Sequence, residues 1–569
     1  MPALSPLHQL FSDAWESQLE LDPLLATQCG DRRYNDRFPR VGEDAIEQQR
    51  QALSGFLARL STIPRTGLSP TDEVNAGVFD AMLRAELELR AAPLYRMALS
   101  RHGGFHTIFL DVIKLIPFES LADYEAYLLR LRGFLEYTRQ NLELLRTGLR
   151  TGFVAAQAAL NGVMETVTPH IVTNPEDSLF FQPLRSFPAA VPPSEQARLQ
   201  NTAREAVQNS VIPAFRELRA FLIDEYLPAC TESIAASQLP GGMALYESMV
   251  RYHTTTNLSP RQIHATGLAE VSRIRAEMEA LQHQVGFSGS LPEFIQSLRA
   301  DPRFYVDTPA QLLKEVALIL KRIDGELPVL FGKLPRLSYG IREIPDYLAP
   351  NSTTAYYLPA PGDGSKAGFY YVNTYDLKSR PLYEYEALSM HEAVPGHHLQ
   401  IALQQELEGL PEFRRFYSFT AYVEGWALYA ERLGLEMGFY RDPYSDFGRL
   451  TYEMWRGCRL VVDTGMHAFG WTRQQAIDFM TENSALSLLN IANEVDRYIA
   501  WPGQALAYKI GELKICELRA LAEHELGAGF DRRAFHDLLL AGGPVPLVVL
   551  EQQVAGWIER QKRQPVESE

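Results

Sequence analysis

The sequence has 569 residues, of which 46% are hydrophobic and 22% are charged, as in an ordinary soluble globular protein. Its formal net charge of −16 and isoelectric point near 5.4 argue against nucleic acid or an anionic membrane as a partner. The four cysteines are widely scattered and form no CxxC pair, so we interpret them as reduced thiols rather than disulfides or metal ligands.

Targeting and domain organisation can be predicted from the same features. The N-terminus has neither the basic nor the apolar segment of a signal peptide, and no apolar run approaches the roughly 20 residues of a membrane-spanning helix. We therefore expect a cytoplasmic protein, either a monomer or a homodimer. We expect residues 1–330 to form a helical region that contributes to a cleft. Residues 331–569 should form the catalytic region and pack with it as one unit.

The N-terminal region has mainly helical patterns. Apolar residues recur every three to four positions over residues 71–98, opposite a face rich in Glu and Arg, which predicts an amphipathic helix. Ser259 followed by Pro260 is typical of a helix start, so we expect a long helix from there to about Gln284.

The only convincing strand pattern lies near residues 350–375. Two short runs there, Ala355–Leu358 and Gly368–Asn373, are rich in the aromatic residues that strands favour. An extended peptide could pair with the edge of such a strand, which makes Tyr371 and Asn373 candidate substrate-binding residues. A hairpin with a purely structural role is the equal alternative. From residue 384 onward the pattern is helical again.

Three histidines and a glutamate lie close together at the start of this second helical region: His391, Glu392, His397 and His398. Two neutral imidazoles can bind zinc, and a neighbouring carboxylate can act as general base. The two histidines of such a motif usually lie four residues apart on one helix face, but here that position is proline. On a straight helix, His398 would return to the face of His391 roughly 10 Å further along the axis, and His397 would point elsewhere.

A kink or bulge at Pro395 and Gly396 would resolve this mismatch. Proline lacks an amide donor and glycine tolerates unusual backbone dihedrals, so the helix is expected to be distorted there. A bulge that absorbs two residues would bring His397 to the place of the second ligand. We therefore favour His397 as the zinc ligand. His398 is the alternative ligand, or else a residue that contacts a ligand or the substrate.

The third ligand is expected on the following helix. A catalytic zinc takes three protein ligands and keeps a fourth position open. Glu424 and Glu431 share one face of a predicted helix that is otherwise apolar, where a carboxylate is costly unless it is paired or metal-bound. The small residues beside Glu424 leave room for a metal, so we predict Glu424 as the ligand. Glu431 is expected on the helix surface or beside a ligand.

Further candidates follow downstream. Asp463 and His467 are four residues apart on one helix face. Asp463 could accept the second ring N–H of a zinc-bound histidine, or it could orient His467 as a donor to the developing oxyanion. A polar pair within the core is nearly as good an interpretation.

The segment around a Trp-Pro-Gly break holds the remaining candidates. Arg497 is suited to bidentate binding of a substrate carboxylate, with Gln504 as a second substrate contact. Tyr498 or Tyr508 could donate a hydrogen bond to the tetrahedral intermediate. A structural role is equally open for each of these residues.

Together these motifs resemble the large bacterial family called domain of unknown function 885. The resemblance is carried by His-Glu-x-x-Pro-Gly-His-His-x-Gln at 391–400, Glu-Gly-Trp-Ala at 424–427, Val-Asp-Thr-Gly-x-His at 462–467 and Trp-Pro-Gly-Gln-Ala at 501–505. It implies a place among the zincin peptidases, with a distant similarity to thimet-type oligopeptidases and Taq-type carboxypeptidases. Those enzymes carry a glycine directly before the second zinc histidine, which matches Gly396 before His397.

We therefore expect a mainly α protein with a large helical zincin-like (gluzincin) fold, a deep cleft and a small sheet near residues 350–375. One Zn²⁺ per chain would be held by His391, His397 and Glu424, and Glu392 would activate water for the cleavage of short peptides. This describes a metallopeptidase of carboxypeptidase or oligopeptidase type. The alternatives are a metal-dependent hydrolase of a non-peptide amide and a non-catalytic helical binding or scaffold protein.

Overall fold

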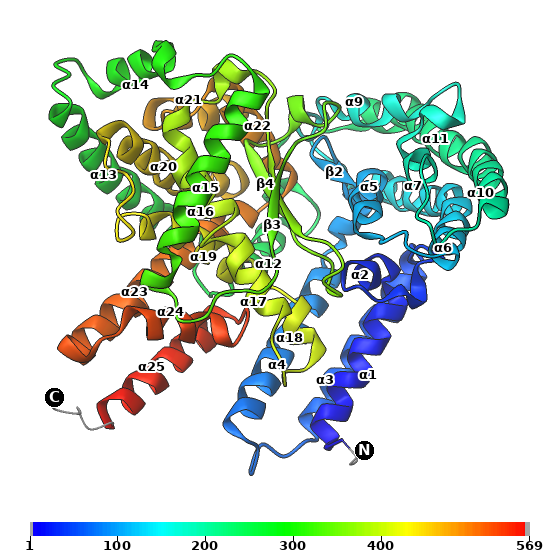
Figure 1. The fold of residues 1–569 in the computed structure, drawn as a ribbon, viewed down its shortest axis with the longest axis horizontal. Helices are drawn as coiled ribbons and strands as arrows, with labels where there is room; N and C mark the ends of the chain where they lie inside the picture. The colour runs from blue at the N-terminus through cyan, green and yellow to red at the C-terminus, as the bar shows by residue number, and fades with distance from the viewer. Residues whose placement is uncertain (1–3, 564–569) are drawn as a thin grey trace. The chain divides into compact units, whose positions relative to one another are not determined.

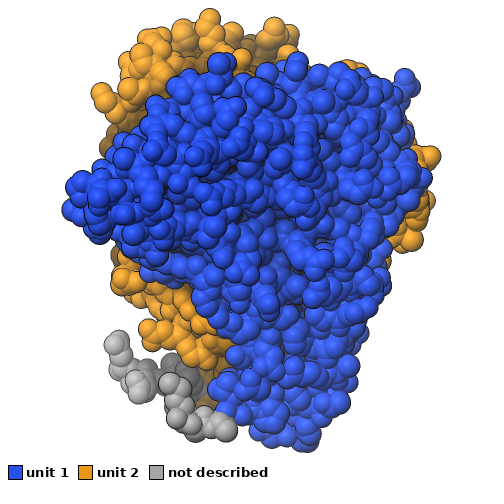
Figure 2. All heavy atoms as spheres, turned by 90° about the vertical axis from the view of Figure 1, so that its right-hand side faces the viewer, with its two compact units in different colours: residues 1–67, 82–233, 360–367 blue, residues 68–81, 234–359, 368–569 orange. Residues whose placement is uncertain are grey.

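The computed structural model describes residues 4–563 and contains mainly α-helices, as predicted (Figure 1). The chain divides into two compact units (Figure 2). Unit 1 contains the chain up to residue 67 together with residues 82–233 and 360–367. Unit 2 contains residues 68–81, 234–359 and the chain from residue 368 onward. Residues 234–330, which we expected in the N-terminal region, therefore group with the predicted catalytic region.

Unit 1 is built from helices around an aromatic core. The rings of Phe109, Phe134, Phe180 and Phe215 lie 5.5–6.3 Å apart. Two short strands, β1 (Leu99–Ser100) and β2 (Gly103–Gly104), form an antiparallel pair. The helices are α1 (Pro6–Leu21), α2 (Pro23–Gln28), α3 (Glu43–Ser61), α5 (Phe105–Leu115), α6 (Leu121–Arg132), α7 (Phe134–Thr151), α8 (Gln157–Leu160), α9 (Val163–Val167), α10 (Pro193–Ala206) and α11 (Ile212–Phe221), and α4 (Pro70–Ala91) runs through residues of both units.

Unit 2 holds the remaining helices. They are α12 (Gly242–Thr254), α13 (Pro260–Gln284), α14 (Leu291–Ala300), α15 (Pro309–Leu330), α16 (Tyr385–Glu392), α17 (His397–Gln405), α18 (Glu412–Phe416), α19 (Thr420–Leu433), α20 (Pro443–Ala468), α21 (Arg473–Asn483), α22 (Leu488–Ala500), α23 (Ala507–Leu526), α24 (Arg532–Ala541) and α25 (Leu547–Arg563). Ser259 caps α13 through a capping box with Gln262, so the predicted helix start is confirmed. None of the helices described is both long and apolar enough to cross a membrane.

Two helix pairs form the framework of unit 2. Helix α13 packs along α20, and α19 packs along α23. The second pair approaches closely because Gly425 faces Gly511: a Cβ atom on Gly425 would lie 2.5 Å from the Gly511 backbone. Most of α20 is buried, so polar side chains on this helix must find partners inside the unit.

A three-stranded sheet completes unit 2. Strand β5 (Gly368–Val372) lies between β3 (Tyr339–Glu343), which is parallel to it, and β4 (Ala355–Leu358), which is antiparallel. The small sheet near residues 350–375 is therefore confirmed. Strand β3 was not predicted, because its partner is remote in sequence and its own residues show no clear alternation. Helix α16 packs against β4.

Candidate metal centre

The His-Glu segment is divided between two helices. Helix α16 ends at Glu392 and α17 begins at His397, so the expected kink or bulge is a complete interruption by residues 393–396. Only glycine fits at position 396, because a Cβ atom there would lie 2.0 Å from the carbonyl oxygen of His391. The turn is held from α19, where Trp426 Nε1 donates a hydrogen bond of 2.9 Å to the Pro395 carbonyl. This turn brings His397 beside His391.

His391, His397 and Glu424 converge. Each offers a ligand atom that lies within 4.8 Å of the other two. Glu424 Oε2 lies 3.7 Å from His391 Nε2 and 3.4 Å from His397 Nε2. Zinc bonds of about 2.0–2.1 Å in a tetrahedral site place ligand atoms about 3.4 Å apart. The three donors therefore match the spacing and the chemistry of a zinc site.

The electrostatics of this trio also favour a cation. Glu424 Oε2 is buried and has no hydrogen-bond partner in the described chain. Burial raises the pKa of Glu424, but His397 and His391 outweigh it and hold the pKa well below its ordinary value. Burial and Arg456 lower the pKa of His391, but Glu424 and Glu431 overcome them and raise it. A bound cation would neutralise the buried Glu424 carboxylate. It would also take the place of the proton that this carboxylate favours on the neighbouring histidine.

The second nitrogen of His391 is held by Glu431. His391 Nδ1 donates to Glu431 Oε1 over 2.8 Å, and Arg456 Nη2 lies 3.1 Å from the same oxygen. Zinc-binding histidines commonly donate their second N–H to a carboxylate in this way. Glu431 lies within the buried core rather than on the helix surface. The contact fixes the His391 ring with Nε2 toward Glu424.

Asp463 and His467 do not serve the roles predicted for them. Asp463 accepts hydrogen bonds from the Tyr246 hydroxyl (2.6 Å) and the Gly503 amide (3.2 Å), so the carboxylate that contacts His391 is Glu431 instead. His467 Nδ1 accepts from the amide of Ala236 (3.1 Å), and its Nε2 bonds the carbonyl of Tyr498 (2.9 Å). With both nitrogens engaged by the backbone, this ring links segments of unit 2 and has no N–H left for an oxyanion.

Tyr508 lies beside the trio and Tyr498 does not. The ring of Tyr508 stacks on that of His391 with centroids 6.1 Å apart. The Tyr498 hydroxyl instead accepts hydrogen bonds from Trp455 Nε1 and Arg459 Nε, each 2.8 Å long. Tyr508 is therefore the better placed of the two predicted donors.

Arg497 and Gln504 form a chain of contacts that leads to the Tyr508 hydroxyl. Arg497 donates to Glu494 Oε2 (2.8 Å) and to Gln504 Oε1 (3.1 Å), and the Gln504 amide lies 3.5 Å from the Tyr508 hydroxyl. Arg459 donates to the same Glu494 oxygen (2.9 Å). The guanidinium of Arg497 is thus occupied largely by protein groups.

The other three sequence candidates lie at the sheet. His398 Nδ1 lies 2.8 Å from the Tyr357 hydroxyl, and burial lowers the pKa of this histidine to about 4. Asn373 Nδ2 donates hydrogen bonds of 2.9 Å to the carbonyls of Ala349 and Thr353. These bonds stabilise the loop before β4. Tyr371 stacks on a neighbouring tyrosine of β4. None of the three belongs to the ligand trio.

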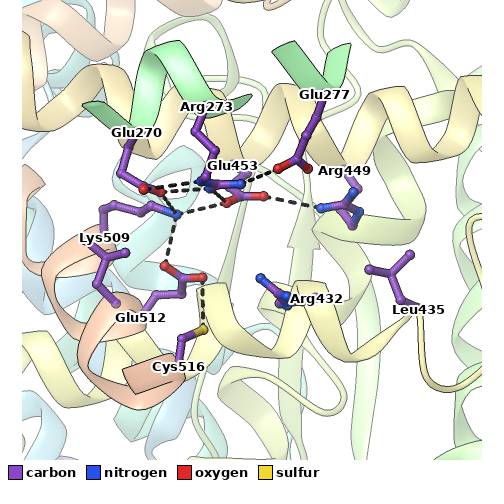
Figure 3. Close-up of a pocket in the computed structure, with 11 residues that line it drawn as sticks. Glu270, Arg273, Glu277, Arg432, Leu435, Arg449, Glu453, Lys509, Glu512 and Cys516 are labelled. Atoms are coloured by element: carbon purple, nitrogen blue, oxygen red, sulfur yellow. Dashed lines mark hydrogen bonds and ion pairs between the residues drawn. The ribbon is translucent and has the colours of Figure 1, made fainter. Parts of the chain in front are cut away.

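An ionic network joins α13, α20 and α23. It lines a cavity of about 350 Å³, and its centre is Lys509, which is fully buried (Figure 3). Lys509 Nζ lies 2.9 Å from Glu270 and Glu453 and 3.0 Å from Glu512. Lys509 directly follows Tyr508 on α23, and Glu453 stands three residues before Arg456 on α20. The network therefore ties together the two helices that carry these neighbours of His391.

The family is established by comparison with known proteins. A model of the family described as bacterial proteins of unknown function, DUF885, matches residues 23–554. The chain belongs to this family. The membership that the motifs predicted is thereby confirmed. No functionally curated protein shows a significant match to this DUF885 protein.

Two solved structures share the fold. The crystal structure of a candidate lipoprotein from Colwellia psychrerythraea matches this DUF885 protein with a TM-score of 0.91 and 28% identity, covering 97% of this chain and 99% of that chain. A candidate lipoprotein of unknown function from Shewanella oneidensis matches with a TM-score of 0.70 and 17% identity, covering 97% and 100%. The second likeness concerns the fold alone.

Sequence reasoning passed over Arg456 and Arg459 of this DUF885 protein. Arg456 contacts Glu431 and His391, and the Arg459 guanidinium lies 4.1 Å from the Tyr508 ring centroid. One signal was available: the two arginines lie three residues apart within residues 454–462, a stretch that holds no other charged residue. A buried arginine needs a partner, which usually makes it structural or functional.

Replacing Glu431 tests the support that it gives to His391. Glu431→Gln should weaken zinc binding roughly 10- to 100-fold, because the neutral amide no longer orients and polarises His391. Competition titration against a chelating indicator measures the change. Glu436→Gln is the matched control, since Glu436 follows the same helix and pairs with Arg519 instead. Equal zinc affinity of the two variants would contradict the assigned contact.

Proposed function

We propose that this DUF885 protein is a zinc-dependent hydrolase that cleaves amide bonds of short peptides, with a zincin-like fold. The observation that carries the proposal is the convergence of His391, His397 and Glu424 next to a free carboxylate, Glu392. Glu392 directly follows His391 at the end of α16. It forms no hydrogen bond or ion pair in the part of the chain described, and it is 9% exposed. A purely structural zinc site needs no such base.

The roles of the residues follow from this arrangement. Zn²⁺ held by the trio would supply a Lewis acid that polarises a carbonyl group and acidifies water. Glu392 accepts the proton of the attacking water and passes it to the leaving amine. Tyr508, beside the His391 ring, donates a hydrogen bond to the oxygen that becomes negative in the transition state. Glu431 and Arg456 hold His391 in the orientation that this chemistry requires.

Zinc stoichiometry and peptide hydrolysis of the wild type, His397→Ala and His398→Ala test the proposal. The wild type should bind one zinc per chain and hydrolyse a pool of di- and tripeptides. His397→Ala should lose zinc and activity, because it removes one of the three ligands. His398→Ala should keep its zinc, since that ring faces the sheet.

Each other outcome has a definite meaning. Zinc binding that survives in His397→Ala but is lost in His398→Ala would reverse the ligand assignment. One zinc per chain without peptide turnover would favour a non-peptide amide as substrate. A wild type that binds no zinc would refute the metal centre.

A further inference from the structure

Polar side chains line one face of α16 over its whole length, from Tyr385 at its start to Glu392 at its end. Tyr385, Ser389 and Glu392 are spaced at i, i+4 and i+7, so they share that face. The hydroxyls of Tyr385 and Ser389 are buried without a well-formed hydrogen bond in the described chain, and so are those of Tyr370 on β5 and Tyr452 on α20. We call these four residues the hydroxyl cluster.

The hydroxyl cluster adjoins the candidate metal centre. Burial raises the pKa of Tyr370 well above its ordinary value; the nearby Tyr385 and Glu392 add to the effect, and the Ser389 hydroxyl opposes it. The Arg456 guanidinium lies 4.7 Å from the Tyr452 ring centroid, and its Nη2 lies 3.3 Å from His391 Nδ1. Buried hydroxyls without protein partners require water or a ligand to satisfy them.

Arg380 acts on Tyr385 of the hydroxyl cluster: burial raises the pKa of that tyrosine, and the charge of Arg380 opposes the rise. Arg380 has no counter-ion among the described residues. It is 2% exposed, and its one hydrogen bond is a 3.4 Å contact with the carbonyl of the preceding residue. Its Nε has no partner, and no carboxylate of the described chain lies within ion-pair distance. The other buried arginines of the described chain each have a hydrogen-bond or ion-pair partner at 3.1 Å or less. The partners are carboxylates for Arg449, Arg456, Arg459 and Arg497 and neutral oxygens for Arg130 and Arg414.

Glu384, on which the charge of Arg380 acts, does not pair with it. The Glu384 side chain is buried and forms no hydrogen bond or ion pair with the described residues. Burial raises the pKa of Glu384 to about 8, although Arg380, Arg299 and Arg456 act to lower it. Most Glu384 is therefore protonated at neutral pH. A buried guanidinium without a counter-charge is costly, which makes this region a place for an anion.

We propose that Arg380 and the hydroxyl cluster bind a carboxylate of the substrate. This inference rests on the proposed function, because it takes Glu392 as the base at the scissile bond. Glu392 lies seven positions after Tyr385 on the helix, a rise of about 10 Å, which an extended peptide covers in about three residues. The carboxylate is thus the C-terminus of a short peptide, or an acidic side chain, within about three residues of the cleaved bond.

Arg380 suits the binding of a substrate carboxylate better than Arg497, the residue that we predicted for this role from the sequence. Arg497 is bonded to Glu494 and Gln504, so a substrate would have to displace protein groups. Arg380 offers its N–H groups without such competition, and tyrosine hydroxyls can add further hydrogen bonds to the same carboxylate.

Three peptides test the proposal: acetyl-tetraalanine as the free acid, its C-terminal amide, and an amide in which glutamate replaces the last alanine. Their dissociation constants are measured by calorimetry on zinc-loaded Glu392→Gln protein, and kcat/KM is measured on the wild type. The free acid should bind roughly 10- to 150-fold more tightly than the plain amide, as expected for hydrogen bonds to a charged group. Tight binding of the glutamate amide as well would identify side chains as a second source of the carboxylate.

The variants assign this preference to Arg380. Arg380→Met should bring acid and amide within about threefold of each other, Arg380→Lys should keep part of the difference, and the exposed control Arg336→Met should keep all of it. Tyr452→Phe, which leaves every charge in place, should weaken acid binding by less than Arg380→Met. Unfolding curves for each variant separate binding effects from loss of the fold.

The outcomes distinguish this inference from the proposed function. Equal binding of acid and amide by the wild-type site, an acid preference that survives Arg380→Met, or no binding of any peptide would each overturn the carboxylate site. Hydrolysis of the free acid and the amide at the same rate would also overturn the carboxylate site, but it would support the proposed peptidase activity. An Arg380-dependent acid preference without any turnover would support the site and refute the peptidase.

Discussion

Glu392→Gln is expected to lower kcat for peptide hydrolysis by roughly 10²- to 10⁴-fold while one zinc remains bound per chain. The amide has nearly the shape of the carboxylate but cannot take a proton from water. Zinc should stay because its expected ligands are His391, His397 and Glu424, none of which bonds Glu392. Since Glu392 has no partner in the described chain, the change should also leave the fold undisturbed.

Elemental analysis and peptide assays of the same preparations measure both parts of this expectation. Glu408→Gln provides the matched control, since it makes the same chemical change on an exposed residue that follows α17. Turnover by Glu392→Gln at the control's rate would show that another group is the base. Loss of zinc together with activity would instead place Glu392 among the ligands.

Lys509→Met is expected to lower the free energy of unfolding by about 3–5 kcal/mol, the usual cost of removing one partner from a buried ionic cluster. Without the lysine, the Glu270, Glu453 and Glu512 carboxylates lose the ammonium group that they share (Figure 3). Arg273 still contacts Glu270 and Glu453, so the network would keep part of its positive charge but have too little to balance its carboxylates. Urea unfolding followed by tryptophan fluorescence measures the change.

The effect should also depend on pH. Burial raises the pKa of Glu453, but Lys509, Arg273 and Arg449 outweigh it and bring the pKa to about 2. A carboxyl group whose pKa is lowered by folding stabilises the protein at pH values above its pKa in the unfolded chain. That stability is lost as the pH falls toward its pKa in the folded protein. The destabilisation by Lys509→Met should therefore be larger at pH 7 than near pH 3.

Lys514→Met on the same helix is the control, because its partners Glu517 and Glu551 are exposed. We expect it to cost less than about 1 kcal/mol. Equal destabilisation by the two substitutions would show that the buried network contributes no more than a surface pair.

The sequence by itself determined the helical class, the place of the small sheet, the family and the three side chains that converge in unit 2. These signals are local. Helical periodicity, aromatic strand runs and the Pro-Gly-His spacing all act within a few residues, and a carboxylate on an apolar helix face such as Glu424 requires a nearby partner wherever the helix packs.

Only the tertiary structure decided which side chains meet across helices. Glu431 rather than Asp463 contacts His391, His398 faces the sheet, and His467 is occupied by backbone groups. The isolation of Arg380 and the pairing of β3 with β5 were equally invisible in the sequence. Each of these depends on how helices and strands remote in sequence approach one another. The energy of a buried polar group depends on the partners that this packing supplies, and they do not lie beside it in the chain.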